Sequence, residues 1–212
     1  MNTHGCRLYI ITPETFDLRA FVDDLARALD AGDVAAVQLR LKNVGDDVWR
    51  RATDALRPMC QSRGVLFLLN DRAELVQATG CDGAHVGQGD MPAGEARPLM
   101  GAGMMLGVTC KSSMDLAEHA VKDGADYVAF GAFFPSGSKQ VTNLADSEIL
   151  RRWAARGSVP ACAIGGITAA NLAPLARAGA NLLAIIGGVW SYAEGPAAGV
   201  RAINAAIKIA RD

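Results

Sequence analysis

Short apolar segments alternate with longer amphipathic segments along the whole sequence. The apolar segments are four or five residues long and are dominated by β-branched and other apolar side chains, which is typical of buried strands. The predicted strands are Leu8–Ile11, Ala35–Leu39, Leu66–Asn70, Gly83–Val86, Met105–Thr109, Tyr127–Phe130, Ala161–Ile164 and Leu182–Ile186.

The segments between these strands carry apolar side chains at helical spacing. In the first of them, Leu18, Phe21, Val22, Leu25 and Leu29 form one apolar stripe, which predicts a helix. Further helices are predicted at Asp46–Arg63, Ser113–Asp123, Asp146–Arg156, Asn171–Ala178 and Ala197–Ala210, with shorter ones at Ala73–Thr79 and Pro92–Met100.

Glycines mark the ends of four predicted helices. Gly32, Gly80, Gly124 and Gly179 each lie shortly before a strand, where we expect the left-handed conformation of a helix C-cap. Strands that alternate with helices predict a parallel sheet with crossover helices. Eight such units without a spare segment favour a closed (β/α)8 TIM barrel, in a single domain that covers residues 1–212. A doubly wound open sheet is the alternative.

Composition narrows the classes of partner. The chain has 21 basic and 22 acidic residues, a net charge of -1 and a sequence pI of about 6.3, which argues against nucleic acid as a partner. The apolar stretch Leu182–Trp190 has nine residues, whereas a membrane span needs about 20. The N-terminal segment also lacks the pattern of a secretory signal. The sequence therefore predicts a cytoplasmic protein without a membrane partner.

Cysteine and histidine spacing argues against disulfides and zinc. The five cysteines are widely spaced without a C-x-x-C pair, which favours reduced thiols. None of the three histidines forms a pair at the spacing of zinc ligands.

The second predicted strand carries the clearest chemical signal. In the segment VQLRLK, apolar and polar side chains alternate, so Gln38, Arg40 and Lys42 share one face. In a barrel this face points into the mouth, where two cations are costly unless a bound anion neutralises them. The alternative is that the strand ends before Lys42, which is then solvated.

Acidic residues follow the third and fourth predicted strands. Asn70 and Asp71 end one strand, and Asp90 follows the next. Two carboxylates opposite a cationic strand suit Mg²⁺, which proteins hold by one or two carboxylates together with substrate phosphates and water. The alternative for each carboxylate is a helix N-cap.

Small residues after the last three strands predict phosphate sites. The segment Ser136-Gly137-Ser138-Lys139 can fold over a phosphate, although it can equally be a surface loop. Gly165-Gly166 and Gly187-Gly188 follow strands seven and eight, where barrel enzymes bind phosphate on backbone amides.

Three other polar residues carry weaker signals. Thr109 can donate a hydroxyl to the mouth, or it is an ordinary strand residue. His85 lies within a strand, which favours a hydrogen-bonded core histidine over a catalytic base, and Cys110 is expected to be inert. The sequence offers no Ser-His-Asp or Cys-His arrangement, so we expect loss of pyrophosphate aided by metal and cations.

Motifs at the predicted strand ends keep the order and spacing of a known family. They are VQLRLK, LLND, HVGQGD, LGVTC, GADYVAFGAFFPSGSK, AIGGIT and LLAII. Together they resemble the thiamine-phosphate synthases, over practically the whole chain. The resemblance implies a transferase that joins 4-amino-2-methyl-5-hydroxymethylpyrimidine pyrophosphate to 4-methyl-5-(2-phosphooxyethyl)thiazole, with Mg²⁺, in a dissociative substitution. Its partners would be these two small phosphorylated substrates, and a homodimer is left open.

The resemblance also implies roles for individual residues. Those implied to contact the pyrimidine pyrophosphate are Gln38, Arg40, Lys42, Asn70, Thr109 and Lys139, with Arg40, Lys42 and Lys139 acting catalytically on the departing charge. Asp71 and Asp90 would hold the metal. Those implied to surround the thiazole phosphate are Ser136, Ser138, Gly166, Ile186 and Gly187, while Leu39, Leu41 and Gly137 complete the substrate-contacting segments.

Some positions depart from the family's usual pattern. Leu41 and Gly89 stand where glutamate is common, and Thr109 replaces a serine. Ser136-Gly137-Ser138 replaces a Thr-Ser-Thr type of loop. Gly187 stands where a serine hydroxyl usually meets the thiazole phosphate. Two alternatives follow: a thiazole tautomerase, which would need a histidine where this chain has Lys111, and a catalytically silent phosphate-binding paralogue.

Overall fold

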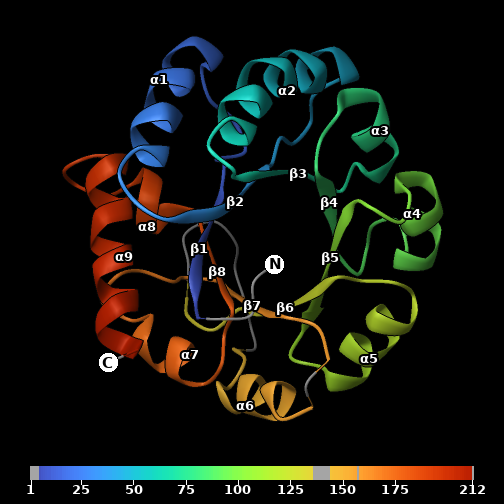
Figure 1. Cartoon of the computed structure of the whole chain (residues 1–212), viewed down its shortest axis with the longest axis vertical. Coiled ribbons are helices and arrows are strands. Elements are labelled where there is room, and N and C mark those ends of the chain that lie inside the picture. Colours follow the sequence, from blue (N-terminus) through green and yellow to red (C-terminus); the bar gives the residue numbers. More distant parts are fainter. Residues whose placement is uncertain (1–4, 136–143, 157, 212) are drawn as a thin grey trace.

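Eight parallel strands close into a barrel with each strand beside its neighbours in chain order (Figure 1). The computed structural model describes residues 5–135, 144–156 and 158–211. The strands are β1 (Arg7–Ile11), β2 (Val34–Leu39), β3 (Leu66–Asn70), β4 (Gly83–Val86), β5 (Met105–Lys111), β6 (Tyr127–Gly131), β7 (Ala161–Ile164) and β8 (Leu182–Ile185). The predicted closed barrel is confirmed, and the open sheet is excluded because β8 pairs with β1.

Helices surround the barrel in the order of the chain (Figure 1). They are α1 (Leu18–Leu29), α2 (Asp46–Gln61), η1 (Ala73–Leu75), α3 (Val76–Thr79), α4 (Ala93–Met100), α5 (Met114–Lys122), α6 (Glu148–Ala154), α7 (Ala173–Arg177), α8 (Gly187–Trp190) and α9 (Pro196–Arg211). Local capping accounts for some boundaries. Asp17 and Ser113 accept N–H bonds at the starts of α1 and α5, and Asp146 accepts one from Glu148 just before α6.

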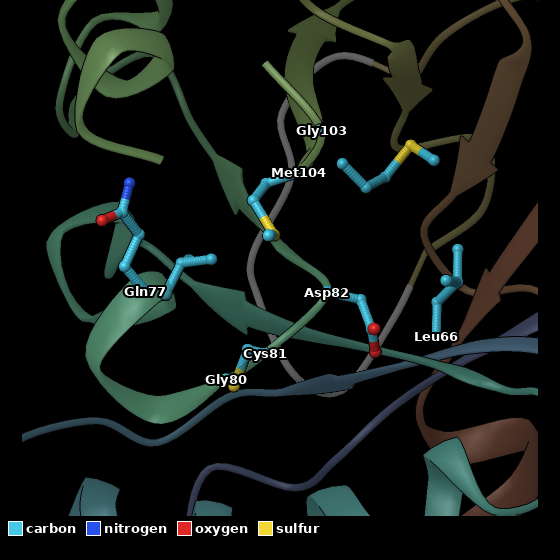
Figure 2. A pocket seen from close by; sticks show the side chains of 9 residues that line it. Leu66, Gln77, Gly80, Cys81, Asp82, Gly103 and Met104 are labelled. Carbon is cyan, nitrogen blue, oxygen red and sulfur yellow. The ribbon is translucent and has the colours of Figure 1, made fainter. Parts of the chain in front are cut away.

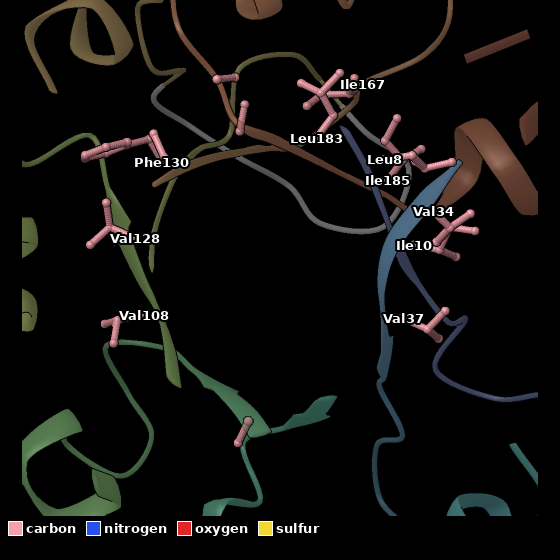
Figure 3. Packing of buried hydrophobic residues seen from close by; sticks show 14 of the residues in the cluster. Leu8, Ile10, Val34, Val37, Val108, Val128, Phe130, Ile167, Leu183 and Ile185 are labelled. Atoms are coloured by element: carbon pink, nitrogen blue, oxygen red, sulfur yellow. The ribbon is translucent and has the colours of Figure 1, made fainter. Parts of the chain in front are cut away.

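The strands bury side chains on both faces. Their outward side chains pack under the helices, where Leu8 and Ile10 of β1 lie near Ile185 of β8 (Figure 3). A smaller cluster fills the interior and includes Leu68, Ala129 and Cys162. This two-sided burial explains why the strands have continuous apolar sequences rather than a simple alternation.

The predicted left-handed conformation holds for three of the four helix-ending glycines. Gly80, Gly124 and Gly179 have φ values of 66°, 93° and 102°. The prediction is wrong for Gly32, which does not have a positive φ. A Cβ there would come within 3.0 Å of the Asn204 side chain on α9, so the absence of a side chain serves close packing instead.

The two ends of the barrel differ in what they offer a ligand. A cavity of about 290 Å³ opens at the amino ends of β3 and β5, where Leu66, Gly80, Asp82 and Met104 line it (Figure 2). The polar residues predicted to be functional lie at the carboxyl ends, so this cavity is not the predicted site. Within the described ranges, no helix is long and apolar enough to cross a membrane.

Candidate active site

Gln38 lies inside the barrel near the carboxyl end of β2. Its side chain is only 2% exposed, and its Nε2 donates to the Tyr9 hydroxyl at 2.6 Å. Val37 and Leu39 face the helices, in keeping with the predicted alternation. Strand β2 ends at Leu39, so the cationic residues that follow lie on the loop beyond the strand rather than within it.

Arg40 is held at the mouth by the loop that follows β1. Its backbone N–H donates to the Thr12 hydroxyl at 2.9 Å, and its guanidinium contacts the Glu14 carboxylate at 2.6 Å. Thr12 is fully buried, so the loop and the end of β2 are fixed to each other. The carboxylate leaves the remaining guanidinium N–H groups able to bind an anion.

Lys42, Asn70 and Asp71 form a second polar group at the mouth. The Lys42 ammonium donates to Asp71 Oδ2 at 2.7 Å, and the Asn70 amide donates to the same oxygen at 2.5 Å. Asp71 has a left-handed backbone, with φ at 60°, and its N–H donates to the His85 carbonyl at 2.8 Å. The strand ends before Lys42, as the alternative predicted, and the Lys42 side chain is 38% exposed, but its ammonium is paired with Asp71.

Asp90 lies next to Asp71. Burial raises the pKa of the Asp90 carboxyl, and contact with the Asp71 carboxylate raises that pKa further, while the Gly87 N–H and Lys42 oppose the shift. The Gly87 N–H donates to Asp90 Oδ2 at 3.0 Å. Two carboxylates that lie this close together are suited to share a cation.

The donor set around Asp71 suits magnesium better than zinc. Within the described ranges, no group of three or more His, Cys, Asp or Glu side chains could hold a metal ion. Magnesium does not need such a group, because substrate phosphates and water supply its other oxygen ligands. The Asp71 and Asp90 carboxylates therefore fit Mg²⁺ as far as the protein's share of the ligands is concerned.

Glycine-rich turns follow β7 and β8. Gly165 and Gly166 have φ values of 103° and 63°, and a Cβ on Gly166 would come within 2.4 Å of the Pro135 carbonyl. Only glycine allows the turn after β7 to lie this close to the segment after β6. Gly187 begins α8 after Ile186, with no positive φ, and no described atom lies within 4 Å of the position of a Cβ.

A chain of hydrogen bonds crosses the barrel interior from Gln38 to Thr109. The Tyr9 and Tyr127 hydroxyls are 3.0 Å apart. His85 Nδ1 lies 2.9 Å from the Tyr127 hydroxyl, and His85 Nε2 lies 2.7 Å from Thr109 Oγ1. Burial lowers the pKa of His85 to about 4, while the nearby Asp90 carboxylate acts in the opposite direction. His85 is thus a hydrogen-bonded core histidine, as predicted.

The comparisons with known proteins agree with one another. The sequence model described as thiamine monophosphate synthase matches residues 8–189. The chain belongs to this family. It is 55% identical to a thiamine-phosphate synthase of Rhodospirillum centenum over 199 residues, which cover 94% of this chain and 96% of that one.

Two further relatives extend the same assignment. A thiamine-phosphate synthase of Hyphomonas neptunium is 48% identical over 204 residues, which cover 94% of this chain and 92% of that one. The structure of a thiamine phosphate pyrophosphorylase from Pyrococcus furiosus matches with a TM-score of 0.84 at 27% identity, over 97% of each chain. The family predicted from the sequence is confirmed, and so is the class of activity, a transferase that synthesises thiamine phosphate.

The structure brings most of the predicted site residues to one end of the barrel. Lys42, Asn70, Asp71 and Asp90 form one group there. Gln38 and Thr109 are the ends of the interior hydrogen-bonded chain, and Arg40 is held by Thr12 and Glu14. The Leu39 and Leu41 side chains are buried in the apolar cluster between the barrel and the helices, so they do not face the mouth. Ser136, Gly137, Ser138 and Lys139 lie outside the described residues.

Tyr9 and Tyr127 are two buried residues with polar groups that the sequence pattern does not mark as functional. Both tyrosines stand within predicted strands, where they look like large apolar side chains. Their hydroxyls meet inside the barrel, which only the closure of the sheet reveals. The signal that could have identified them is the tyrosine hydroxyl itself, which needs a hydrogen-bond partner when it is buried. Two tyrosines that point into the barrel therefore predict polar contacts in its interior.

Proposed function

We propose that this family member condenses 4-amino-2-methyl-5-hydroxymethylpyrimidine pyrophosphate with 4-methyl-5-(2-phosphooxyethyl)thiazole at the carboxyl end of its barrel. The products are thiamine phosphate and pyrophosphate. The observation that carries this placement is the contact of Lys42, Asp71 and Asp90 with one another at the mouth, with Arg40 held just after β2 by Thr12 and Glu14. Cations for a pyrophosphate and carboxylates for its metal are thus side by side.

Arg40 and Lys42 are suited to bind the pyrophosphate. Each has a carboxylate partner, Glu14 or Asp71, but the Lys42 side chain is 38% exposed and that of Asp71 is 21% exposed. Ion pairs that are open to water are worth only about 0–1 kcal/mol. The pyrophosphate with its metal ion can therefore replace these contacts at little cost.

Asp71 and Asp90 are the residues that would hold Mg²⁺. When bound, the ion would supply electrostatic stabilisation of the negative charge on the departing pyrophosphate. The chain's own contribution is to keep the two carboxylates together. Asn70 and Lys42 hold the Asp71 carboxylate, and the Gly87 N–H holds that of Asp90.

The thiazole phosphate is expected at the turns after β7 and β8. Gly166 brings the backbone close to the segment after β6, and the Gly187 N–H stands at the start of a helix, where such groups have no partner within the helix. Ser136 and Ser138 would add hydroxyl donors, and Lys139 would act on the pyrophosphate. These last roles rest on the family resemblance.

The reaction then depends on charge and position rather than on a base. Arg40, Lys42 and Lys139 would stabilise the negative charge as the bond between the pyrimidine methylene and pyrophosphate breaks. The electron-rich aminopyrimidine carries the resulting positive charge, and the thiazole nitrogen attacks it. Because that nitrogen has no proton to lose, the second substrate needs orientation only.

The alternative activities have less support. A thiazole tautomerase of this type would need a histidine after β5, and the chain has Lys111 at the end of that strand. A silent paralogue would have no reason to keep cations and carboxylates together at the mouth.

Incubation of the purified protein with both substrates and Mg²⁺ tests the function. We expect thiamine phosphate and pyrophosphate to form in equal amounts, and each single-substrate control to form neither. A product that needs only the thiazole compound would instead indicate a tautomerase. No product at any Mg²⁺ concentration would overturn the proposal.

A further inference from the structure

The hydrogen-bonded chain through the barrel joins two residues that are expected to contact substrate. It runs from Gln38 on β2 through Tyr9, Tyr127 and His85 to Thr109 on β5. The three middle side chains are at most 6% exposed, so water does not compete for their hydrogen bonds. Buried polar groups of this kind are costly unless every donor and acceptor is matched.

The absence of a side chain at Gly107 leaves room for the hydrogen-bonded chain. A Cβ at this inward position of β5 would lie 2.0 Å from Cζ of Tyr127 and 2.2 Å from its hydroxyl oxygen. The missing side chain therefore admits the tyrosine hydroxyl to a place between Tyr9 and His85. The Tyr9 and Tyr127 rings meet edge to face, which fixes the two hydroxyls further.

The chain has a direction that follows from its first bond. Gln38 Nε2 donates to the Tyr9 hydroxyl, so that hydroxyl has its own proton left to donate to Tyr127. In this direction the Tyr127 hydroxyl donates its own proton to His85 Nδ1, 2.9 Å away. A neutral imidazole has one donor and one acceptor, so His85 must carry its proton on Nε2.

The same direction defines both ends of the chain. His85 Nε2–H donates to Thr109 Oγ1, which leaves the threonine proton free for another acceptor. At the other end, Gln38 uses its amide N–H on Tyr9, which leaves Oε1 as an acceptor. An aminopyrimidine pyrophosphate offers an amino donor for the acceptor and phosphate oxygens for the donor.

We propose that Tyr9, Tyr127 and His85 are positioning residues that fix Gln38 as a hydrogen-bond acceptor and Thr109 as a hydrogen-bond donor toward the pyrimidine substrate. The inference rests on the proposed function, because that function places both end residues against the substrate. The middle residues act through Gln38 and Thr109 and need not touch the substrate themselves.

The histidine tautomer tests the direction without any activity measurement. Nitrogen NMR of protein labelled at histidine, at pH 7, should find His85 neutral with its proton on Nε2, and a His85→Gln variant assigns the signal. A proton on Nδ1 would mean that the Gln38 amide and the whole chain run the other way, and would overturn the proposal. An imidazolium with both nitrogens protonated would overturn it as well.

A double-mutant cycle tests the effect on the reaction. Tyr127→Phe and Thr109→Val should each lower kcat/KM for the pyrimidine pyrophosphate about tenfold, the equivalent of one hydrogen bond. The KM for the thiazole phosphate should stay unchanged. The double variant should be no worse than Thr109→Val alone, because Tyr127 acts through the threonine, whereas multiplied effects of about a hundredfold would contradict this.

Two more variants separate positioning from mere stability. Thr109→Ser keeps the hydroxyl and should retain nearly full activity. Thr79→Val removes another buried hydroxyl, one that donates to the Leu75 carbonyl at 2.7 Å beside the amino-end cavity, and should leave the kinetics unchanged. If the unaltered protein makes no thiamine phosphate, the proposed function fails, and the tautomer still decides whether the chain has the proposed direction.

Discussion

The backbone conformation of Asp71 explains why its carboxylate contacts two other polar residues at the mouth. Its left-handed conformation turns the chain directly after β3, and Lys42 and Asn70 both bind one of its oxygens. Aspartate tolerates this conformation better than most residues. Asp71 thus has two roles, because it supplies the carboxylate and also permits the turn. This makes Asp71 harder to replace than Asp90.

Removal of either carboxylate should weaken Mg²⁺ binding without unfolding the barrel. Asp71→Asn and Asp90→Asn should each lower turnover about a hundredfold or more, since outer-shell changes alone typically cost ten- to a hundredfold. Each should also raise the Mg²⁺ concentration that gives half-maximal rate. Steady-state kinetics over a range of Mg²⁺ concentrations measures both.

The control for these variants is an acidic residue at the other end of the barrel. Asp123 is exposed after α5, and Asp123→Asn should keep the kinetics of the unaltered protein. Full activity of both mouth variants in excess chelator would show that neither carboxylate holds a metal.

Gly187 can accept a serine without strain. A hydroxyl that binds a phosphate is worth about 1.5–3 kcal/mol, so Gly187→Ser should tighten binding of the thiazole phosphate by roughly ten- to a hundredfold. The backbone has no positive φ, and no described atom lies within 4 Å of the new Cβ. The thiazole-phosphate KM, measured beside the Tm, tests this.

Gly103→Ser is the matched control for this change. Gly103 likewise has open space among the described residues and no positive φ, but it lies beside the amino-end cavity. It should alter neither KM nor Tm. A stable Gly187→Ser protein with an unchanged KM would mean that this position does not face the phosphate.

At the scale of elements, strand bounds were more predictable than helix ends. β3, β4 and β7 begin and end as expected, because apolar residues buried on both faces leave little choice of register. β5 continues to Lys111 since its pairing with β6 resumes after an irregularity at Thr109. No apolar pattern in the sequence predicts that β5 continues to Lys111.

Helix α8 is the element that the sequence analysis missed. It has four residues, two of them glycines, so neither length nor propensity indicates a helix. It lies where the chain passes from β8 to α9, a connection that depends on the whole barrel rather than on the local sequence. The site shows the same limit: polar residues at strand ends were predictable, whereas the meeting of Tyr9 with Tyr127 depends on barrel closure.

Strand β5 should not tolerate a side chain at Gly107. In Gly107→Ala the new Cβ would overlap the Tyr127 ring, and overpacking of a core typically costs about 1–3 kcal/mol. We expect the free energy of unfolding to fall by at least this amount. Urea denaturation followed by circular dichroism measures the loss.

Gly103→Ala provides the comparison at an open position just before the same strand. It should change the free energy of unfolding by no more than about 0.5 kcal/mol. Equal stability of the two variants would mean that Tyr127 can move aside without cost, and that Gly107 does not hold the ring in place.

For the whole molecule, the barrel separates two kinds of polar group. The cations and carboxylates of the mouth lie in contact with water. The side chains of the interior hydrogen-bonded chain lie within the closed sheet; they are Gln38, Tyr9, Tyr127 and His85. The first set can rearrange around a ligand at low cost, and the second set cannot. The buried interior side chains therefore stay fixed, while the charged side chains of the mouth can adapt to a ligand.

The buried histidine should make the whole molecule sensitive to acid. Burial lowers the pKa of His85 to about 4 from an ordinary 6.5, so the unfolded chain binds a proton at a higher pH than the folded one. The resulting stability is present above pH 6.5 and is lost as the pH falls toward 4. Between pH 7 and pH 5 the free energy of unfolding should fall by about 2 kcal/mol through this residue alone.

Urea denaturation at a series of pH values tests this, with His85→Gln as the variant that should lose most of the slope in that interval. His119→Gln is the control, because His119 is exposed on α5 and its replacement should leave the slope as it is. Nitrogen NMR of the folded protein gives the independent reading, in which His85 should stay neutral down to about pH 4. A His85 that titrates near pH 6.5 in the folded state would contradict the prediction, since its protonation would then cost the folded barrel nothing.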